Sequence, residues 1–259
     1  MSTNSRAAIV TGASSGIGAA VARALAARGV DVLIDYAHNR EAADQVASEC
    51  RALGVRAVTA PGDVADDDAC RALAATALEA FGRIDFLVNN AGVSKFVPHA
   101  KLDGLDATDF GRIFAVNVTG AFQMVRAVLP SLRASGQGAI VNVASVAGTC
   151  GVGSSVAYAA SKAALLNLTL TLARALAPEV RVNAVAPGFV DTPWHAAGMG
   201  TERYQKAKTI VAAGTPLKAV TEPADVAEPI VWLLEHARHV TGETLHVDAG
   251  LHLKVGQLD

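Results

Sequence analysis

Two side chains that can exchange protons, Tyr158 and Lys162, stand four residues apart in a segment rich in Ala and Leu. In a helix this spacing places the phenol and the ammonium on one face. A free tyrosine has a pKa of about 10, and an ammonium held nearby favours the phenolate and lowers that value. The phenol could then exchange a proton with a substrate oxygen. An ordinary surface Tyr-Lys pair explains these residues equally well when they are taken alone.

A glycine-rich turn, residues 11–18 with the sequence Thr-Gly-Ala-Ser-Ser-Gly-Ile-Gly, is the second chemical feature. It lies where an apolar strand is expected to meet a helix, so backbone N–H groups and the helix N-terminus could receive a pyrophosphate. The spacing of Gly12, Gly16 and Gly18 is G-x-x-x-G-x-G and differs from the common G-x-G-x-x-G pattern. A dinucleotide site therefore needs support from the rest of the chain, and a tight turn without a ligand is the alternative.

The elements that must position these residues alternate between strand and helix, which predicts one α/β domain, residues 1–259, with a doubly wound parallel sheet flanked by helices on both faces. The expected strands are Ala7–Val10, Asp31–Asp35, Val55–Ala60, Ile84–Val88, Ala139–Val143, Val180–Val185 and Thr244–Val247. The expected helices are Ala19–Ala27, Glu41–Leu53, Asp66–Phe81, Ala107–Leu132 and Val156–Leu176.

The segment from Gly188 to Thr221 is the most irregular part of the chain, with one helix expected at Glu202–Ala212. We interpret it as a flap over a site, and a surface insertion is the alternative. Trp194 and His195 lie in this flap, but single aromatic and imidazole groups in a loop are more often packing or surface residues. We therefore assign them no catalytic role.

Composition narrows the class of protein. The chain has 259 residues, of which 51% are hydrophobic and 18% charged, and its net charge is −2. No basic surface for nucleic acid or an anionic membrane is expected. We also expect no apolar stretch of the roughly 20 residues that span a bilayer, no signal peptide and therefore a cytoplasmic location. The three cysteines are expected to be packing thiols. His236 and His239 lack further ligands, so no metal site is predicted.

With these motifs in hand, the chain resembles the short-chain dehydrogenase/reductase family along nearly its whole length. The matching segments follow the family's order. They are Thr11 to Gly18, Asp63-Val64, Asn89-Asn90-Ala91-Gly92, Asn117, Ser145, Tyr158, Lys162, Pro187-Gly188 and Thr192. The resemblance implies a Rossmann-like fold and an NAD(P)(H)-dependent oxidoreductase that interconverts a secondary alcohol and a ketone.

Four catalytic residues follow from the resemblance. Ser145 would polarise the carbonyl oxygen, on which negative charge grows during reduction. Tyr158 would supply the proton, and Lys162 would lower the pKa of the phenol and bind the nicotinamide ribose. Asn117 would hold a water that returns a proton to Lys162. Taken alone, Asn117 reads as a packing amide and Ser145 as a cap at a strand end.

The cofactor contacts that the resemblance implies cover both ends of a dinucleotide. Asp63 would accept from the adenine amino group, although a turn or helix cap is the alternative, and Thr192 would bind the carboxamide. The segment from Asn89 to Gly92 would line the adenosine side, although an Asn-rich turn explains it almost as well. The full set is Gly12, Ser14, Ser15, Gly16, Ile17, Gly18, Tyr36, His38, Asn39, Asp63, Val64, Asn89, Ala91, Gly92, Tyr158, Lys162, Pro187, Gly188 and Thr192.

The choice between NAD(H) and NADP(H) depends on the end of the second strand. Tyr36 takes the position where NAD-preferring relatives carry an acidic residue, and alternation turns Asp35 to the opposite face. The His-Asn-Arg run at 38–40 offers a cation and amide donors, which favours NADP(H). Ser15 occupies a place where many NADP users carry Arg, which argues the other way.

Two alternatives remain open. A 3-oxoacyl-carrier-protein reductase would need a basic docking face, for which Arg126, Arg133 and Arg174 are sparse. A cofactor-sensing protein without turnover would not need a phenol with a shifted pKa.

Relatives are usually tetramers that pair long helices and C-terminal strands, so we expect a homotetramer. The apolar tail Thr244–Val255 is compatible with it. The residues do not identify the substrate, because loop shape sets specificity.

Overall fold

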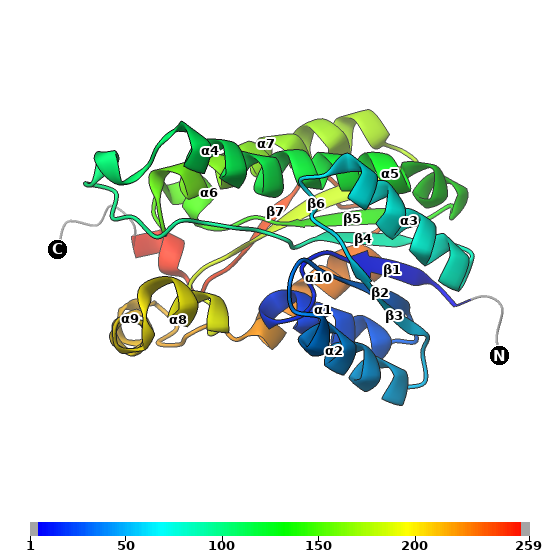
Figure 1. Cartoon of the computed structure of the whole chain (residues 1–259), viewed down its shortest axis with the longest axis horizontal. Coiled ribbons are helices and arrows are strands. Elements are labelled where there is room, and N and C mark those ends of the chain that lie inside the picture. Colours follow the sequence, from blue (N-terminus) through cyan, green and yellow to red (C-terminus); the bar gives the residue numbers. More distant parts are fainter. Residues whose placement is uncertain (1–4, 255–259) are drawn as a thin grey trace.

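A seven-stranded parallel sheet forms the centre of the molecule in the computed structural model, which describes residues 5–254 (Figure 1). The strand order is β3-β2-β1-β4-β5-β6-β7, and it reverses direction between β1 and β4. Ligands of such sheets bind at this switch point, outside the carboxyl ends of the strands. The strands are β1 (Ala7–Val10), β2 (Asp31–Tyr36), β3 (Ala57–Pro61), β4 (Phe86–Asn89), β5 (Gly138–Val143), β6 (Val180–Pro187) and β7 (Thr244–Val247).

Helices cover both faces of the sheet, as the alternating sequence predicted (Figure 1). One face carries α1 (Gly16–Ala26), α2 (Arg40–Ala52) and α10 (Pro223–Glu235). The other carries α3 (Asp67–Phe81), α4 (Ala107–Phe114), α5 (Ala121–Ala134) and α7 (Val156–Leu176). Further helices lie toward the carboxyl ends of the strands, namely α6 (Ala147–Cys150), α8 (Pro193–Met199) and α9 (Thr201–Gly214).

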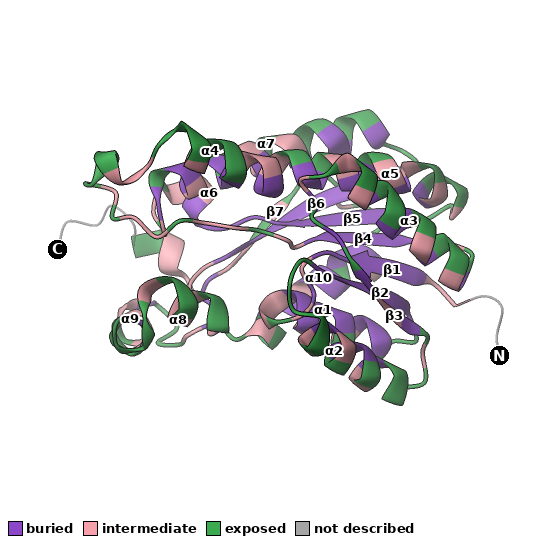
Figure 2. Cartoon of the chain, in the orientation of Figure 1, coloured by how far each residue is buried: buried purple, intermediate pink, exposed green. Residues whose placement is uncertain are grey.

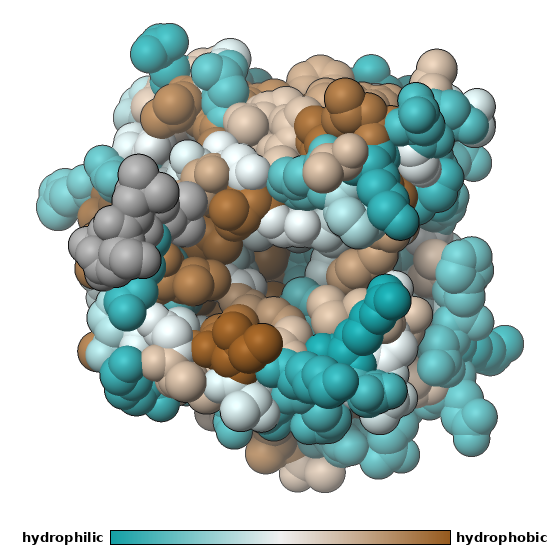
Figure 3. All heavy atoms as spheres, turned by 90° about the vertical axis from the view of Figure 1, so that its left-hand side faces the viewer, coloured by the Kyte–Doolittle hydropathy of each residue, from teal (hydrophilic) through white to brown (hydrophobic). Residues whose placement is uncertain are grey.

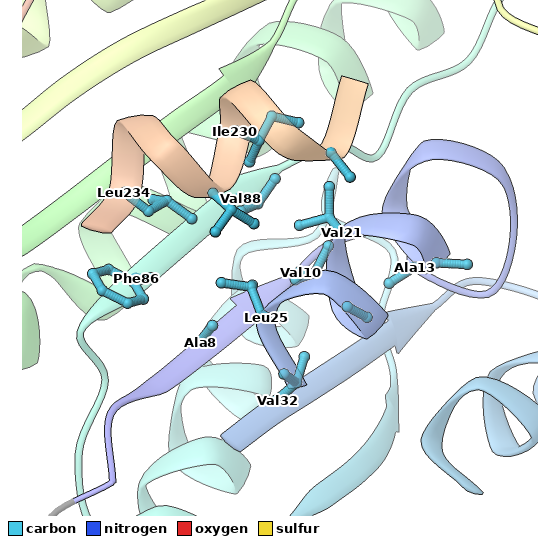
Figure 4. Packing of buried hydrophobic residues seen from close by; sticks show 14 of the residues in the cluster. Ala8, Val10, Ala13, Val21, Leu25, Val32, Phe86, Val88, Ile230 and Leu234 are labelled. Atoms are coloured by element: carbon cyan, nitrogen blue, oxygen red, sulfur yellow. The ribbon is translucent and has the colours of Figure 1, made fainter. Parts of the chain in front are cut away.

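The core lies between the sheet and its helices, and the inner strands are buried along their whole length (Figure 2). Strands covered on both faces are expected to be apolar throughout, and β1 (Ala-Ala-Ile-Val) is such a strand. Figure 4 shows Val21 and Leu25 of α1 gathered with Ile230 and Leu234 of α10 over the sheet. This packing fixes α1, and therefore the turn that precedes it.

Helix α10 was not expected from the sequence. Pro223 and Pro229 obscure its periodicity, although Pro223 stands in the first turn, where a missing N–H costs no hydrogen bond. The flap segment was also underestimated, because it holds two helices, α8 and α9, rather than one. An isolated bridge between Val190 and Thr221 joins the two ends of this segment.

The long helix expected over residues 107–132 is continuous over 107–134, but a π-helical turn, Ala115–Gly120, interrupts its regular geometry between α4 and α5. Such turns widen a helix locally and often occur at functional sites. Asn117 lies within it. The amino-acid pattern carries no signal for the extra residue in this turn.

Two helices, 107–134 and α7, are long and apolar enough to span a membrane by length and composition alone. The expectation that no apolar stretch reaches this length is therefore wrong, because scattered polar residues lower the mean hydropathy of these windows only a little. Within this fold both helices pack against the sheet and against each other. Core helices of globular proteins have the same composition.

Candidate active site

The glycine-rich turn begins after β1 and leads into α1, as expected. Gly12 and Gly16 have φ angles of +60° and +55°, which only glycine adopts without strain. Ser15 precedes α1 in an extended conformation and makes no side-chain cap, so its side chain leaves the first N–H groups of the helix free for a ligand. A Cβ at Gly18 would lie 2.5 Å from Asn90 Nδ2. The turn is therefore shaped to bring backbone N–H groups close to an anion.

Two residues that the sequence did not single out hold this turn in place. Asp35, at the end of β2, accepts the Gly12 N–H at 2.9 Å through Oδ2. Asn90 donates from Nδ2 to the carbonyl oxygens of Thr11 and Gly12, at 2.9 and 3.0 Å. The Asn89-Asn90 pair in the sequence indicated that this segment lies near the glycine turn. Which of the two Asn side chains reaches the turn depends on how the strand ends pack.

Helix α7 positions the proton-exchanging pair. Ser155 caps its N-terminus by accepting the Tyr158 N–H at 3.2 Å. Deeper in the core, Asn142 of β5 donates to Thr169 of α7 at 2.9 Å, which fixes the helix against the sheet. The Lys162 ammonium lies 5.6 Å from the Tyr158 ring centroid. The predicted pair therefore lies on one face of this helix.

The pKa of the Tyr158 phenol differs from the expectation. Although the whole side chain is half-buried, protein surrounds the phenol, and this burial raises its pKa to about 12 against a smaller lowering by the Ser145 hydrogen bond. The expected lowering by Lys162 is therefore wrong for this arrangement, in which the ammonium donates to the Val143 carbonyl at 2.7 Å. Burial lowers the pKa of Lys162 to about 8. The phenol is protonated at neutral pH, which is the form that donates.

Ser145 follows β5 and combines the two interpretations of its sequence position. Its hydroxyl accepts the Ala147 N–H at 3.1 Å, as a cap at the strand end would. Ser145 also lowers the pKa of the Tyr158 phenol, although less than burial raises it. Ser145 and Tyr158 both line one cavity.

Asn117 is fully engaged through its side chain. Its amide accepts the Val93 N–H at 2.8 Å and donates to the Val93 carbonyl and to Ser161 Oγ, each at 3.0 Å. These bonds match the packing interpretation. The two bonds to Val93 also fix the loop after β4. The role of Asn117 in holding a water stays a prediction.

One cavity of about 410 Å³ joins the glycine turn to the Tyr-Lys pair, and Figure 3 shows a hollow on the face formed by the flap and the C-terminal part of the chain. Many of the predicted cofactor residues line this cavity. They are Gly12, Ser15, Gly16, Ile17, Ala91, Gly92, Tyr158, Lys162, Pro187, Gly188 and Thr192. The other predicted residues do not line it. They are Ser14, Gly18, Tyr36, His38, Asn39, Asp63, Val64 and Asn89.

The segment after β6 closes one side of the cavity. A Cβ at Gly188 would lie 2.6 Å from Asp248 Cβ, so only glycine allows this approach of β6 to the chain after β7. Thr192 is buried, and a Cβ at Gly16 would lie 3.2 Å from its methyl group. The glycine turn and the flap therefore meet directly, as a site between them requires.

Asn89 does not face the cofactor cavity, contrary to the expectation. Its amide donates to Asn142 Oδ1 at 2.9 Å and to the Ala121 carbonyl at 3.3 Å, and the side chain is buried. Alternation along β4 explains the difference, because neighbouring residues point to opposite faces of the sheet. Asn89 ties β4 to β5, and Asn90 takes the position beside the turn.

The residues expected at the adenosine end lie around the ends of β2 and β3. Asp63 accepts the Ala65 N–H at 3.0 Å, as a turn cap would, and pairs with Arg112 at 2.9 Å. Asn39 caps α2 by accepting the Ala42 N–H at 3.0 Å. His38 and Asn39 are exposed, so their polar groups remain accessible to a bound ligand.

The donor set fits a dinucleotide better than a metal ion. Over residues 5–254, no group of three His, Cys, Asp or Glu side chains is arranged to hold a metal. The turn instead offers backbone N–H groups and an uncapped helix N-terminus, and Lys162 supplies a buried cation. These are donors for phosphate and ribose oxygens.

Known proteins resemble the chain over nearly its full length. A family model described as enoyl-(acyl carrier protein) reductase matches residues 12–252. A Streptomyces violaceoruber protein described as ketoacyl reductase 2 of the granaticin polyketide synthase is 41% identical over 95% of this chain and 96% of its own length. The cis-4-hydroxycyclohexanecarboxylate dehydrogenase of Sinomonas cyclohexanicum is 42% identical over the same shares.

A solved structure shares the fold. It is a Burkholderia xenovorans protein described as a short-chain dehydrogenase/reductase, which superposes with a TM-score of 0.90 at 39% identity. The superposition covers 96% of this chain and 99% of that protein. The two proteins therefore share the same overall fold.

Proposed function

The chain belongs to the short-chain dehydrogenase/reductase family, and from this premise we propose that it interconverts a ketone and a secondary alcohol with NADP(H), using Ser145, Tyr158 and Lys162. The main support for this proposal is that these three side chains and the glycine turn line a single cavity. Separate surface positions would not permit one reaction to use them all.

In the reductive direction, negative charge develops on the carbonyl oxygen of the substrate. Ser145 would donate a hydrogen bond to that oxygen, and the protonated Tyr158 phenol would transfer its proton to it. Lys162 would stabilise the phenolate that is left behind once its ammonium turns from the Val143 carbonyl toward the phenol, because a nearby cation favours the charged form. The surrounding protein that raises the pKa of Tyr158 also limits loss of its proton to water.

The cofactor would lie along the cavity from the glycine turn to Thr192. Gly12 to Gly18 would bind the pyrophosphate, Lys162 a ribose, and the segment from Pro187 to Thr192 the nicotinamide end. The chemistry that a bound nicotinamide dinucleotide supplies there is hydride transfer to or from carbon. Asn117 would hold the loop after β4 through its bonds to Val93, and the neighbourhood of Lys162 through its bond to Ser161.

The reaction class is tested with a panel of ketones and NADPH deuterated at the transferable position. We expect dinucleotide oxidation that depends on a ketone, with deuterium on the carbinol carbon of the product. Ketone-independent oxidation, or tight dinucleotide binding with no turnover across ketones, sugars and acyl thioesters, would contradict the proposal.

The preference for NADP(H) has its support in the exposed His38 and Asn39 and in the absence of a carboxylate at Tyr36. Asn39→Asp tests it while conserving the fold, because Asp caps a helix as well as Asn does. The added carboxylate would repel a 2′-phosphate, so we expect kcat/KM for NADPH to fall at least about tenfold while the value for NADH changes little. Faster turnover of NADH than of NADPH by the unsubstituted protein would refute the preference.

An acyl thioester is the second candidate substrate, favoured by the similarity to a protein described as a ketoacyl reductase. Acetoacetyl thioesters of a small thiol and of an acyl carrier protein distinguish the two candidates. A carrier-specific enzyme is expected to turn over the carrier form with much lower KM.

A cytoplasmic location and a homotetramer also belong to this proposal. Apolar side chains exposed on α4, α5 and α7 support the tetramer, and Val255 of the expected tail lies outside the described residues.

A further inference from the structure

Most of the cavity lining around Tyr158 and Ser145 is apolar, and Ser154 and His195 are polar residues that also line it. The apolar walls come from the loop after β5, from the flap and from the short 3₁₀ helix Leu251–Lys254. The residues are Val146, Ala147, Val152, Phe189, Trp194, Val211 and Leu251. Most of them are side chains that prefer contact with carbon to contact with water.

Charge is nearly absent from this lining. Within the described chain, Lys162 is the only Lys, Arg, Asp or Glu that lines the cavity. Its ammonium is already bonded to the Val143 carbonyl, and the proposed reaction assigns it to the phenol and a ribose. A carboxylate or phosphate on the substrate would therefore enter the cavity without a counter-ion, which is strongly unfavourable.

His195 does not supply the missing cation. Burial lowers its pKa to about 4, so the imidazole is neutral at physiological pH. The ring stacks on Phe189 with centroids 4.3 Å apart, and its buried Nδ1 has no hydrogen-bond partner among the described residues. A neutral imidazole with an unused nitrogen can share one hydrogen bond with a polar ligand group, but it cannot balance a charge.

Trp194 places a flat surface beside the reacting phenol. Its ring centroid lies 5.7 Å from that of Tyr158, and Phe96 supports it from another side at 4.9 Å. Trp194 is 36% exposed, so part of its ring remains free for a ligand. Rings pack against such surfaces with large contact area and little loss of conformational freedom.

We propose that the substrate is a small, uncharged ketone or secondary alcohol carried on a ring that packs against Trp194, and that Trp194 determines this specificity. This inference rests on the proposed function and concerns the substrate half of the same cavity. The cavity of about 410 Å³ must also hold the nicotinamide end of the cofactor, so the substrate is small.

The first experiment compares three ketones that differ in one property each, with saturating NADPH. Cyclohexanone is the uncharged ring, 2-hexanone has the same number of carbon atoms in a chain, and 4-oxocyclohexanecarboxylate adds a charge to the ring. We expect kcat/KM for cyclohexanone to exceed the other two values at least about tenfold. Equal or faster turnover of the chain or of the charged ring would overturn the inference and leave the proposed function intact.

The second experiment changes the walls. Trp194→Leu should remove most of the preference for the ring over the chain, whereas Trp232→Leu, an exposed Trp of α10 outside the cavity, should leave it unchanged. Val211→Arg introduces a cation at a half-buried lining position of α9, and Val211→Leu is its matched control. We expect only the Arg variant to favour 4-oxocyclohexanecarboxylate over cyclohexanone.

The results separate the two proposals. If the Trp194→Leu variant still turns over 2-hexanone and keeps the wild-type preference for the ring, the assignment of specificity to Trp194 is overturned. Failure of the wild-type protein to oxidise NADPH with every ketone and thioester would instead refute the proposed function, and this inference with it.

Discussion

At the scale of single residues, Asp35 lies in surroundings that oppose its charge. It is 1% exposed, its Oδ1 has no hydrogen-bond partner among the described residues, and Asp63 adds a second negative charge nearby. Burial raises its pKa to about 7, against a smaller lowering by the Gly12 N–H. Because this carboxylate holds the glycine turn, its protonation state bears on the cofactor site.

Asp35 makes stability depend on pH. The folded protein binds this proton more tightly than the unfolded chain, whose carboxyl has a pKa near 3.8. The stabilising contribution is therefore fully present below about pH 4 and is lost as the pH rises through about 7. At about 1.4 kcal/mol per tenfold change in proton affinity, its upper bound is on the order of 4 kcal/mol.

Asp35→Asn keeps an oxygen for the Gly12 N–H and removes the charge. We expect the free energy of unfolding at pH 8 to rise by about 1–3 kcal/mol, with little change at pH 4.5, as measured by urea denaturation. Asp68→Asn, whose side chain is 96% exposed, serves as the control for loss of an acidic residue. The same pH dependence in Asp35→Asn and wild type would contradict the assigned titration.

The sequence was sufficient to predict the catalytic residues, because their types and spacing are characteristic. It was not sufficient to predict the residues that hydrogen-bond to the glycine turn. Tyr158, Lys162 and Ser145 were found from sequence because the chemistry requires those side chains. Asp35 and Asn90 act through contacts between strand ends that are distant in sequence, and no local pattern reveals such contacts. The pKa of Tyr158 depends on burial, which the chain defines only once folded.

At the scale of elements, Asp191 ties the start of the flap to α9 and to the flap's end. Its carboxylate accepts from Lys208 and from Tyr204, both on α9, and its N–H donates to the Thr221 carbonyl at 2.9 Å. The hydrogen bond from Lys208 is the main cause that lowers the pKa of Asp191. These contacts stabilise the fold above the unfolded pKa and are lost as the pH falls through the lower folded value. We therefore propose that Asp191 positions the flap.

Asp191→Asn tests this role. With weakened contacts to α9, we expect KM for the ketone to rise about three- to tenfold with a smaller change in kcat, and faster limited proteolysis between α8 and α9. Lys206→Gln is the matched control, because its ion pair with Glu202 lies within α9 and is exposed. Equal effects of the two substitutions would show that Asp191 has no special role.

The sequence predicted most strands and long helices correctly, but it did not predict the irregular turn within a helix or the helix that contains proline. The strands and the longer helices appeared in the alternation of apolar segments, with bounds shifted by up to three residues, as for α1, which begins at Gly16 rather than Ala19. The π-helical turn and α10 escaped prediction because one depends on a single extra residue and the other contains Pro229. Both serve the site, one by placing Asn117 and one by supporting α1.

At the scale of the whole molecule, the βα alternation was sufficient to predict the sheet and its covering layers, because parallel strands require helical crossovers on both faces. Some apolar side chains are exposed on the surface of the single chain, and they suggest contacts between chains. Phe110 and Phe122 are 38% and 42% exposed on α4 and α5, and Leu170 of α7 is 50% exposed. We expect these side chains to be covered by other copies of the chain in the proposed tetramer.

We expect four chains per particle in light scattering at micromolar concentration. Phe122→Glu, which places a charge in the proposed contact, should reduce the mass to that of a smaller assembly. Lys206→Gln on the exposed side of α9 should leave the mass unchanged. A monomeric wild-type protein would refute the expected tetramer without affecting the proposed chemistry.

The measurement that tests the central claim most directly is the turnover of Tyr158→Phe beside its dinucleotide affinity. This substitution removes one oxygen from a helix that Ser155 and Thr169 hold in place, so binding of NADPH should change less than about threefold. Loss of the proton donor is expected to lower kcat at least about a thousandfold. A variant that binds NADPH and retains a tenth or more of the wild-type kcat would contradict the account.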